Sequence, residues 1–136
     1  HIHQITPSVI RQDPDGSMLL DAGEEITGMI LLTADGKDGD RVKLFYGEEL
    51  DGKGSVRYDM RCNCCYREIW TLADGRCEFD PYDYKGFRYV KIVPDGGVKL
   101  SDIRFLVRHY PMDESLCELK TCLLYTSPSP RDSFVS

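Results

Sequence analysis

Four of the six cysteines lie close together, and their thiolates are the first groups that could do chemistry. They are Cys62, Cys64, Cys65 and Cys77. Zinc sites usually take Cys-x-x-Cys or Cys/His pairs, whose spacing lets two ligands reach one ion. On a strand, Cys62 and Cys64 would point to one face and Cys65 to the other, so the thiolates would not converge. We therefore predict reduced thiols in a cytoplasmic protein, with no zinc ion and no disulfide within residues 62–65; a zinc or redox site is the alternative.

Carboxylates are the second candidate group, because Glu48, Glu49, Asp80 and Asp83 could supply the acid and base of a glycosidase. Glycoside hydrolysis needs two carboxyl groups on opposite sides of one bond, with one pKa raised by burial. These four acids flank turns rich in glycine and proline, where solvent keeps carboxylates ionised. The sequence favours solvated turn charges and predicts no catalytic residue.

The three histidines show no pattern of a catalytic site in the sequence. His1 and His3 begin the chain, and His109 stands alone at the end of a predicted strand, without a serine or cysteine nucleophile motif nearby. The glycines mark turns rather than a phosphate-binding loop, because no predicted helix follows them. We accordingly predict no catalytic, metal-binding or cofactor-binding residue, and no cofactor.

Aromatic residues are the last candidates, since exposed rings can stack on sugars. Tyr82, Tyr84, Phe87 and Tyr89 follow one another closely, and Trp70 lies one predicted strand earlier. Their alternation with polar residues favours core packing for most of them, and carbohydrate binding is the alternative. The residues expected on strands, most of them buried, are Trp70, Phe87, Tyr89, Val90, Ile92, Ile103, Phe105 and Val107.

The elements that must position these residues are strands, because apolar and polar residues alternate and helical periodicity is nearly absent. Alternating runs cover residues 42–46, 66–72, 87–92 and 103–108, and in the third Phe87 and Tyr89 oppose Arg88, Val90 and Ile92. Turn signals separate the runs at residues 14–16, 35–39, 51–54, 73–75 and 94–97. Seven or eight strands of this kind predict an all-β fold, an antiparallel β-sandwich.

Charge and hydropathy exclude two classes of partner. The 136 residues carry a formal net charge of −6, which argues against a large nucleic-acid interface because phosphate binding requires clustered positive charge. The longest apolar stretch, Met29–Leu32, is far too short to span a bilayer, so no membrane partner is expected.

An ordered set of motifs carries a resemblance to a known family. The motifs are Asp21-x-Gly23-Glu24-Glu25-Ile26-Thr27-Gly28, Tyr46-Gly47-Glu48-Glu49-Leu50, Trp70-Thr71-Leu72, Tyr82-Asp83-Tyr84-Lys85-Gly86-Phe87-Arg88-Tyr89-Val90 and Arg108-His109-Tyr110-Pro111. Together they make residues 19–110 resemble the concanavalin-like, jelly-roll sandwich domain of bacterial α-L-rhamnosidases. Residues 62–65 depart from the common pattern and fit only a subset of such proteins.

The resemblance implies a parent enzyme whose chemistry lies elsewhere. In that family the sandwich precedes an (α/α)6 barrel, which carries the acid and base of an inverting hydrolase acting on rhamnosylated glycans or glycosides. None of those catalytic positions is in this chain. The resemblance therefore implies an accessory, non-catalytic fragment that packs against a missing catalytic domain. An autonomous carbohydrate-binding module and an interaction domain of an unrelated enzyme are the alternatives.

The expected organisation has four segments. Residues 1–16 are expected to be a linker from a missing upstream region, 17–110 the sandwich, and 111–121 a connector to the catalytic domain. The segment 122–136 contains a ten-residue string, 123–132, that resembles translated sequencing-adapter read-through in metagenomic gene predictions. A non-native tail with few core contacts is therefore expected there, and a natural Ser/Pro-rich linker is the alternative.

Overall fold

The protein folds as an antiparallel β-sandwich, which confirms the predicted fold class. The computed structural model describes residues 1–116, and within them it contains no α-helix and no helix long and apolar enough to cross a membrane. The strands are β1 (Ile2–Ile5), β2 (Ser8–Gln12), β3 (Met18–Gly36), β4 (Arg41–Gly47), β5 (Arg67–Thr71), β6 (Gly75–Phe79), β7 (Lys85–Pro94) and β8 (Lys99–Arg108). Two short 3₁₀ turns, η1 (Arg61–Asn63) and η2 (Glu114–Leu116), complete the elements.

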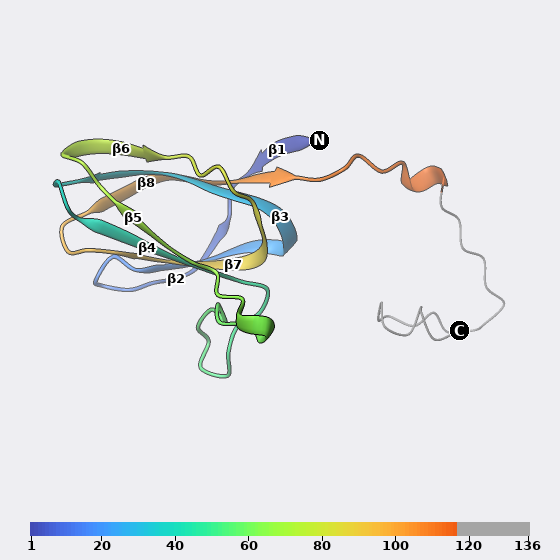
Figure 1. Cartoon of the computed structure of the whole chain (residues 1–136), viewed down its shortest axis with the longest axis horizontal. Helices are drawn as coiled ribbons and strands as arrows, with labels where there is room; N and C mark the ends of the chain where they lie inside the picture. Colours follow the sequence, from blue (N-terminus) through green and yellow to red (C-terminus); the bar gives the residue numbers. More distant parts are fainter. Residues whose placement is uncertain (117–136) are drawn as a thin grey trace.

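The long strand β3 belongs to both layers of the sandwich (Figure 1). Its first half pairs with β2 and β7, and β7 continues through β4 to β5. Its second half pairs with β6 and β8, and β8 pairs with β1. The two layers are therefore β2–β3–β7–β4–β5 and β6–β3–β8–β1.

Gly28 marks the point at which β3 passes from one layer to the other. It pairs with Lys85 of β7 and with Val107 of β8. A Cβ atom at this position would lie 2.4 Å from the main-chain oxygen of Leu106, closer than non-bonded atoms can approach. Glycine is required here because the backbone of β8 occupies the space of a side chain.

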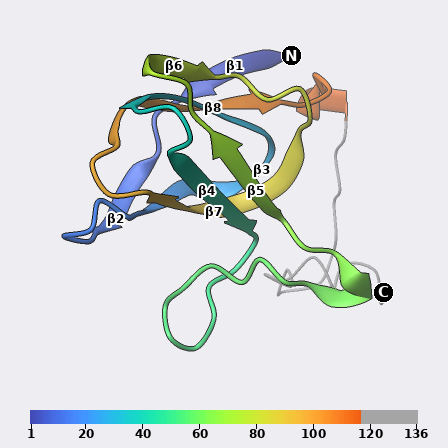
Figure 2. The ribbon, with the colours of Figure 1, turned by 60° about the vertical axis from the view of Figure 1, so that its left-hand side comes forward.

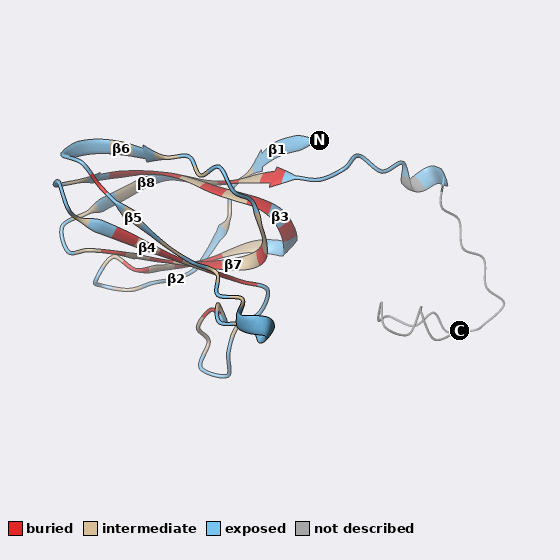
Figure 3. Cartoon of the chain, viewed as in Figure 1, coloured by how far each residue is buried: buried red, intermediate tan, exposed pale blue. Residues whose placement is uncertain are grey.

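Buried residues lie on strands of both layers (Figure 3), and their side chains form one hydrophobic core cluster. Its centre is Phe87 of β7, whose ring is fully buried and meets Tyr46 of β4 and Phe105 of β8 edge to face, at centroid distances of 5.2 and 5.3 Å. All eight residues predicted for the core lie on strands. Phe87, Val90, Ile92, Phe105 and Val107 are buried, and Trp70, Tyr89 and Ile103 are half-buried, which confirms the prediction.

The predicted alternation along β7 is wrong in one respect. Phe87, Val90 and Ile92 all contribute to the core, although the simple pattern placed Phe87 on the opposite face from the other two. The reason lies in β3, where the register shifts between Asp21 and Ile26. A bulge in one strand turns its neighbour, so the inward face of β7 changes phase between Phe87 and Val90.

The predicted linker over residues 1–16 contains two strands of the sandwich. β1 pairs with β8 and β2 pairs with β3, each in antiparallel register. Both are edge strands made mostly of exposed residues, so they lack the alternation of a strand with one buried face. The five predicted turns are confirmed, and each holds a glycine with positive φ.

Candidate functional site

Cys62 lies on the 3₁₀ turn η1, Cys64 directly follows it, and Cys65 forms an isolated β-bridge with Asp59, so the expectation of a continuous strand over residues 62–65 is wrong. Cys62 has a left-handed backbone with φ 63°, and Cys62 and Cys65 are exposed while Cys64 is half-buried. Figure 2 shows η1 below the sandwich, on the side away from β6, which carries Cys77. These four cysteines are free thiols. The position of Cys77 in the other layer now argues against four convergent ligands, and the absence of zinc stays a prediction.

The four carboxylates considered as a glycosidase pair are all exposed, as predicted. Glu49 forms an ion pair with Arg57. Asp80 lines a groove of about 290 Å³ on the outer face of the β6–β3–β8–β1 layer, together with Glu78 and Asp102. The structure therefore leaves these four acids in contact with solvent, outside any pocket that could enclose a sugar and its attacking water.

Arg104 of β8 also lines the groove beside Asp80, and it forms hydrogen bonds with two other residues there. Its Nη1 atom donates to Oε1 of Gln4 at 2.6 Å, and its Nη2 atom donates to Oδ2 of Asp102 at 2.9 Å. Its Nε atom is buried and has no partner among the described residues. Arg104 thus links β1 to β8 across the groove and places a positive charge among the three acids.

Asp21 and Arg88 join two of the sequence motifs that carry the family resemblance. The guanidinium contacts the carboxylate through Nε–Oδ1 at 2.9 Å and Nη2–Oδ2 at 3.1 Å, and the N–H of Gly23 donates to the same carboxylate at 2.7 Å. The hydrogen bonds from Arg88, followed by that from Gly23, hold the pKa of Asp21 below its ordinary value. This pair fixes the bulge of β3 against β7.

We expect Asp21→Asn to lower the free energy of unfolding by about 1 kcal/mol at pH 7, because a half-exposed, bidentate ion pair is worth about that much. A carboxylate whose pKa is lower in the folded than in the unfolded protein contributes its full stabilisation at pH values above the unfolded pKa of about 3.9. This stabilisation is lost as the pH falls through the folded pKa. The difference between the two proteins should therefore shrink below about pH 4. Urea denaturation at pH 7 and pH 3 measures both values.

The matched control for this prediction is Asp13→Asn, which removes a carboxylate 3.2 Å from Nε of Arg11 in an ion pair that is more exposed than that of Asp21 and Arg88. Its effect on the free energy of unfolding should be close to zero. An Asp21→Asn effect that stays constant from pH 7 to pH 3 would show that the ion pair is not its source.

Glu68 is the other partly buried carboxylate of interest, and it is bound on both oxygens. The hydroxyl of Tyr46 donates to Oε2 at 2.7 Å, and Nζ of Lys85 contacts Oε1 at 2.5 Å. Burial, followed by the charge of Glu68, raises the pKa of Tyr46 above its ordinary value. The cluster joins β4, β5 and β7, and no feature of the sequence indicated it.

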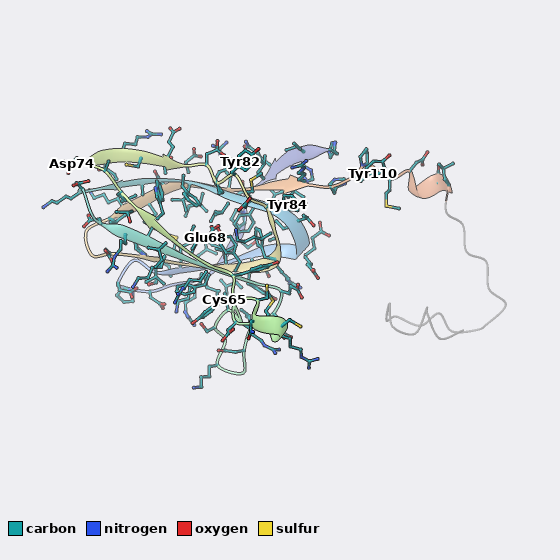
Figure 4. The ribbon with its side chains drawn as sticks, in the orientation of Figure 1. Cys65, Glu68, Asp74, Tyr82, Tyr84 and Tyr110 are labelled. Carbon is teal, nitrogen blue, oxygen red and sulfur yellow. The ribbon has the colours of Figure 1, made fainter. Side chains whose placement is uncertain are left out.

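The aromatic residues divide between the core and one end of the molecule. Trp70 packs on Phe79 with ring centroids 4.8 Å apart, whereas Tyr82 and Tyr84 are exposed. Figure 4 shows Tyr82, Tyr84 and Tyr110 toward the end where the chain leaves β8, far from Asp74 at the opposite end. The expectation that most of these aromatics pack in the core holds for Phe87, with Trp70 and Tyr89 half-buried, and Tyr82 and Tyr84 are the exceptions.

A hollow of about 470 Å³ lies at this connector end. Tyr84, the last residue of the β6–β7 loop, and Tyr110, which follows β8, line it together with Ile2 of β1. The guanidinium of Arg108 lies 5.4 Å from the centroid of the Tyr84 ring. We call the exposed apolar residues of this region the connector-end surface; they are Ile2, Tyr82, Tyr84, Tyr110 and Met112.

The three histidines converge, although no local pattern predicted a partner for any of them. Antiparallel pairing of β1 with β8 brings His1 and His3 beside His109, and their potential ligand atoms all lie within 4.8 Å of one another. Within residues 1–116 this is the one such group of histidine, cysteine or acidic side chains. The His-x-His spacing could have indicated a shared face, but the third histidine depends on a pairing between the two ends of the domain.

Comparison with protein families gives a match over most of the described chain. The family described as the bacterial alpha-L-rhamnosidase concanavalin-like domain matches residues 11–104. The match includes the bulge of β3, the Tyr46–Glu68–Lys85 cluster and the core strands. A comparison with curated proteins finds no significant match.

Solved structures with the same fold include three rhamnosidases. The α-L-rhamnosidase from Dictyoglumus thermophilum superposes with a TM-score of 0.64 at 26% identity over 78% of this chain. A GH78 family rhamnosidase of Bacillus sp. GL1 superposes with a TM-score of 0.62 at 22% identity over 79% of this chain. A rhamnosidase from Klebsiella oxytoca superposes with a TM-score of 0.55 at 15% identity over 74% of this chain. The matched region spans 13%, 12% and 22% of those chains, respectively.

Proposed function

The chain belongs to the family of bacterial α-L-rhamnosidase concanavalin-like domains, and on this premise we propose that it is the accessory, non-catalytic sandwich of an α-L-rhamnosidase. The observation that carries the proposal is the family match over residues 11–104, combined with the small share of the related enzymes that the sandwich occupies. The parent enzyme would release terminal α-L-rhamnose from glycans or glycosides, with inversion, in its barrel domain.

The state of the carboxylates supports a non-catalytic role. An inverting glycosidase places its two carboxyl groups about 6.5–9.5 Å apart and raises the pKa of one of them. Here the candidate acids are exposed, and the two partly buried carboxylates discussed above, Asp21 and Glu68, are each bound to a cation. Arg88 lowers the pKa of Asp21, which makes this carboxyl group a poor proton donor at neutral pH.

The connector-end surface supports packing against a catalytic domain. Five large apolar side chains are exposed there, beside the segment that is proposed to lead into that domain. The alternative of a carbohydrate-binding module is less well supported. Among the five aromatic residues considered for sugar stacking, Phe87 is buried and Trp70 is half-buried against Phe79. The guanidinium of Arg108 lies over the ring of Tyr84 and that of Arg88 over the ring of Tyr89, which leaves Tyr82 as the one free ring of the five.

The proposed organisation keeps residues 111–121 as the connector to the barrel and 122–136 as a non-native tail. The predicted lack of core contacts over Leu123–Ser136 lies outside the described residues. A cytoplasmic location is proposed because the four described cysteines are free thiols, which a reducing compartment maintains.

The test is a comparison of this chain with a longer protein in which the downstream barrel is restored in frame after Thr121. We expect no release of nitrophenol from an aryl α-L-rhamnoside by the 136-residue chain, and readily measurable turnover by the longer protein. The paired change Asp80→Asn and Asp83→Asn should leave the turnover of the longer protein unchanged, because these acids lie outside the proposed catalytic domain.

Two outcomes would contradict the proposal. Turnover by the 136-residue chain that disappears in the Asp80→Asn and Asp83→Asn variant would make the sandwich catalytic. An inactive longer protein that is folded would reject the rhamnosidase assignment. The packing role is tested in the same longer protein by Tyr84→Ser and Tyr110→Ser, which should separate one unfolding transition into two, whereas Ile69→Ser on the edge strand β5 should not.

A further inference from the structure

Two strands from opposite ends of the domain place the three histidines on one face. Ile2 of β1 is opposite Arg108 of β8, and His3 is opposite Val107. The ladder continues by one pair, since the main-chain nitrogen of His1 donates to the oxygen of His109 at 2.8 Å and the nitrogen of His109 donates back at 3.1 Å. Because side chains alternate along a strand, His1 and His3 share a face, and His109 joins them across the ladder.

The imidazole rings are already in contact. The ring centroids are 5.3 Å apart for His1 and His3, 5.0 Å for His1 and His109, and 5.7 Å for His3 and His109. A tetrahedral zinc ion with Zn–N bonds of about 2.0–2.1 Å needs nitrogen atoms about 3.4 Å apart. The three rings are exposed, so side-chain rotation alone can bring ligand atoms that lie within 4.8 Å to that spacing.

A second observation concerns the ring orientation of His109. Its Nδ1 atom lies 3.0 Å from the main-chain oxygen of Tyr110. With a proton on Nδ1 the ring donates to this carbonyl, and the lone pair of Nε2 is left for a metal ion. Histidine ligands of zinc commonly make such a hydrogen bond through the other ring nitrogen, because it fixes the tautomer and the ring plane.

We propose that His1, His3 and His109 form a binding site for a divalent transition-metal ion, and that Zn²⁺ is the ion it takes. Three neutral imidazoles bind zinc in preference to magnesium or calcium, because the latter two ions prefer oxygen ligands. One nitrogen of each ring would bind the ion, and water would complete the coordination. The ion would clamp the edge strand β1 onto β8 beside the connector-end surface.

The experiment uses the 136-residue chain without an affinity tag, because a polyhistidine tag would bind the same metals. Isothermal titration calorimetry with zinc chloride should show one zinc ion bound per chain, with a micromolar dissociation constant. At a hundredfold excess of free zinc over its dissociation constant, Tm should rise by about 10 °C. Cobalt(II) should give the visible bands of a nitrogen and oxygen site without a thiolate-to-cobalt charge-transfer band.

Variants separate the histidine site from the thiols. The chain has only three histidines, so His3→Ala and His109→Ala each remove a ligand from this site and from no other; each should weaken zinc binding by at least about tenfold. The triple change Cys62→Ser, Cys64→Ser and Cys65→Ser should leave the zinc affinity unchanged. Gln4→Ala, next to His3 on β1, should also leave it unchanged. Failure to bind zinc, binding unaffected in both histidine variants, or loss of binding in the cysteine variant would each overturn the proposal.

Discussion

Replacing Gly28 with alanine is expected to lower the free energy of unfolding by about 3 kcal/mol, at the upper end of the usual range for overpacking a folded core. The new Cβ would lie 2.4 Å from the oxygen of Leu106 and 3.3 Å from Cα of Val107. Both neighbours are backbone atoms of β8, which cannot rotate away as a side chain would. β3 and β8 would have to separate at the position where β3 changes layers. Urea denaturation followed by fluorescence of Trp70, the single tryptophan, measures the change.

The matched control is Gly86→Ala in the neighbouring strand β7. Gly86 pairs with Thr27, next to Gly28, but an added Cβ there meets no atom within 4 Å. Its effect should be within about 0.5 kcal/mol of zero, because only the entropy of the unfolded chain and a small exposed area change. Equal effects at the two glycines would contradict the close approach of β3 and β8 as the reason for glycine at position 28.

Replacing Phe87 with alanine is expected to lower the free energy of unfolding by about 3–5 kcal/mol. The ring is fully buried, and it contacts Tyr46 within its own layer and Phe105 in the opposite layer. Alanine would remove both edge-to-face contacts and leave a cavity at the centre of the core. Since domains of this size are stable by about 5–15 kcal/mol, the variant should lose a large part of its stability. Equilibrium urea denaturation of both proteins gives the difference.

Tyr82→Ala provides the comparison for Phe87, because it removes a ring that is 98% exposed. This substitution should change the free energy of unfolding by no more than about 0.5 kcal/mol. A loss of less than about 1 kcal/mol for Phe87→Ala would mean that the ring contributes no more than a surface residue, and it would contradict the arrangement of the core.

The sequence predicted the fold class and the central strands because these depend on local patterns. Alternation of apolar and polar residues located β4, β5, β7 and β8, and glycine-rich signals located the turns between them. The same reasoning failed where the conformation depends on a neighbour. The bulge near Asp21 changes the inward face of β7, and an exposed edge strand such as β2 has no buried face to produce a pattern.

The candidate sites were predicted less well, and for a related reason. The exposure of the four candidate carboxylates followed from their turn positions. The grouping of His1 and His3 with His109 depends on a pairing between residues more than a hundred positions apart, which no local pattern encodes. The left-handed backbone at Cys62 and Asn63 also has no strong signal, since neither residue is glycine. Contacts between distant segments must be known before such sites can be identified.

The pairing of β1 with β8 brings the entrance and the exit of the sandwich together. The main-chain atoms of His1 and His109 are hydrogen-bonded to each other, so the polypeptide enters and leaves the domain at one point. A domain of this kind can be inserted into a loop of another protein, or circularly permuted by joining its ends, without stretching the flanking chain. Within a multidomain enzyme, the segments before and after such a sandwich emerge side by side, and a rotation of the sandwich displaces both of them at once.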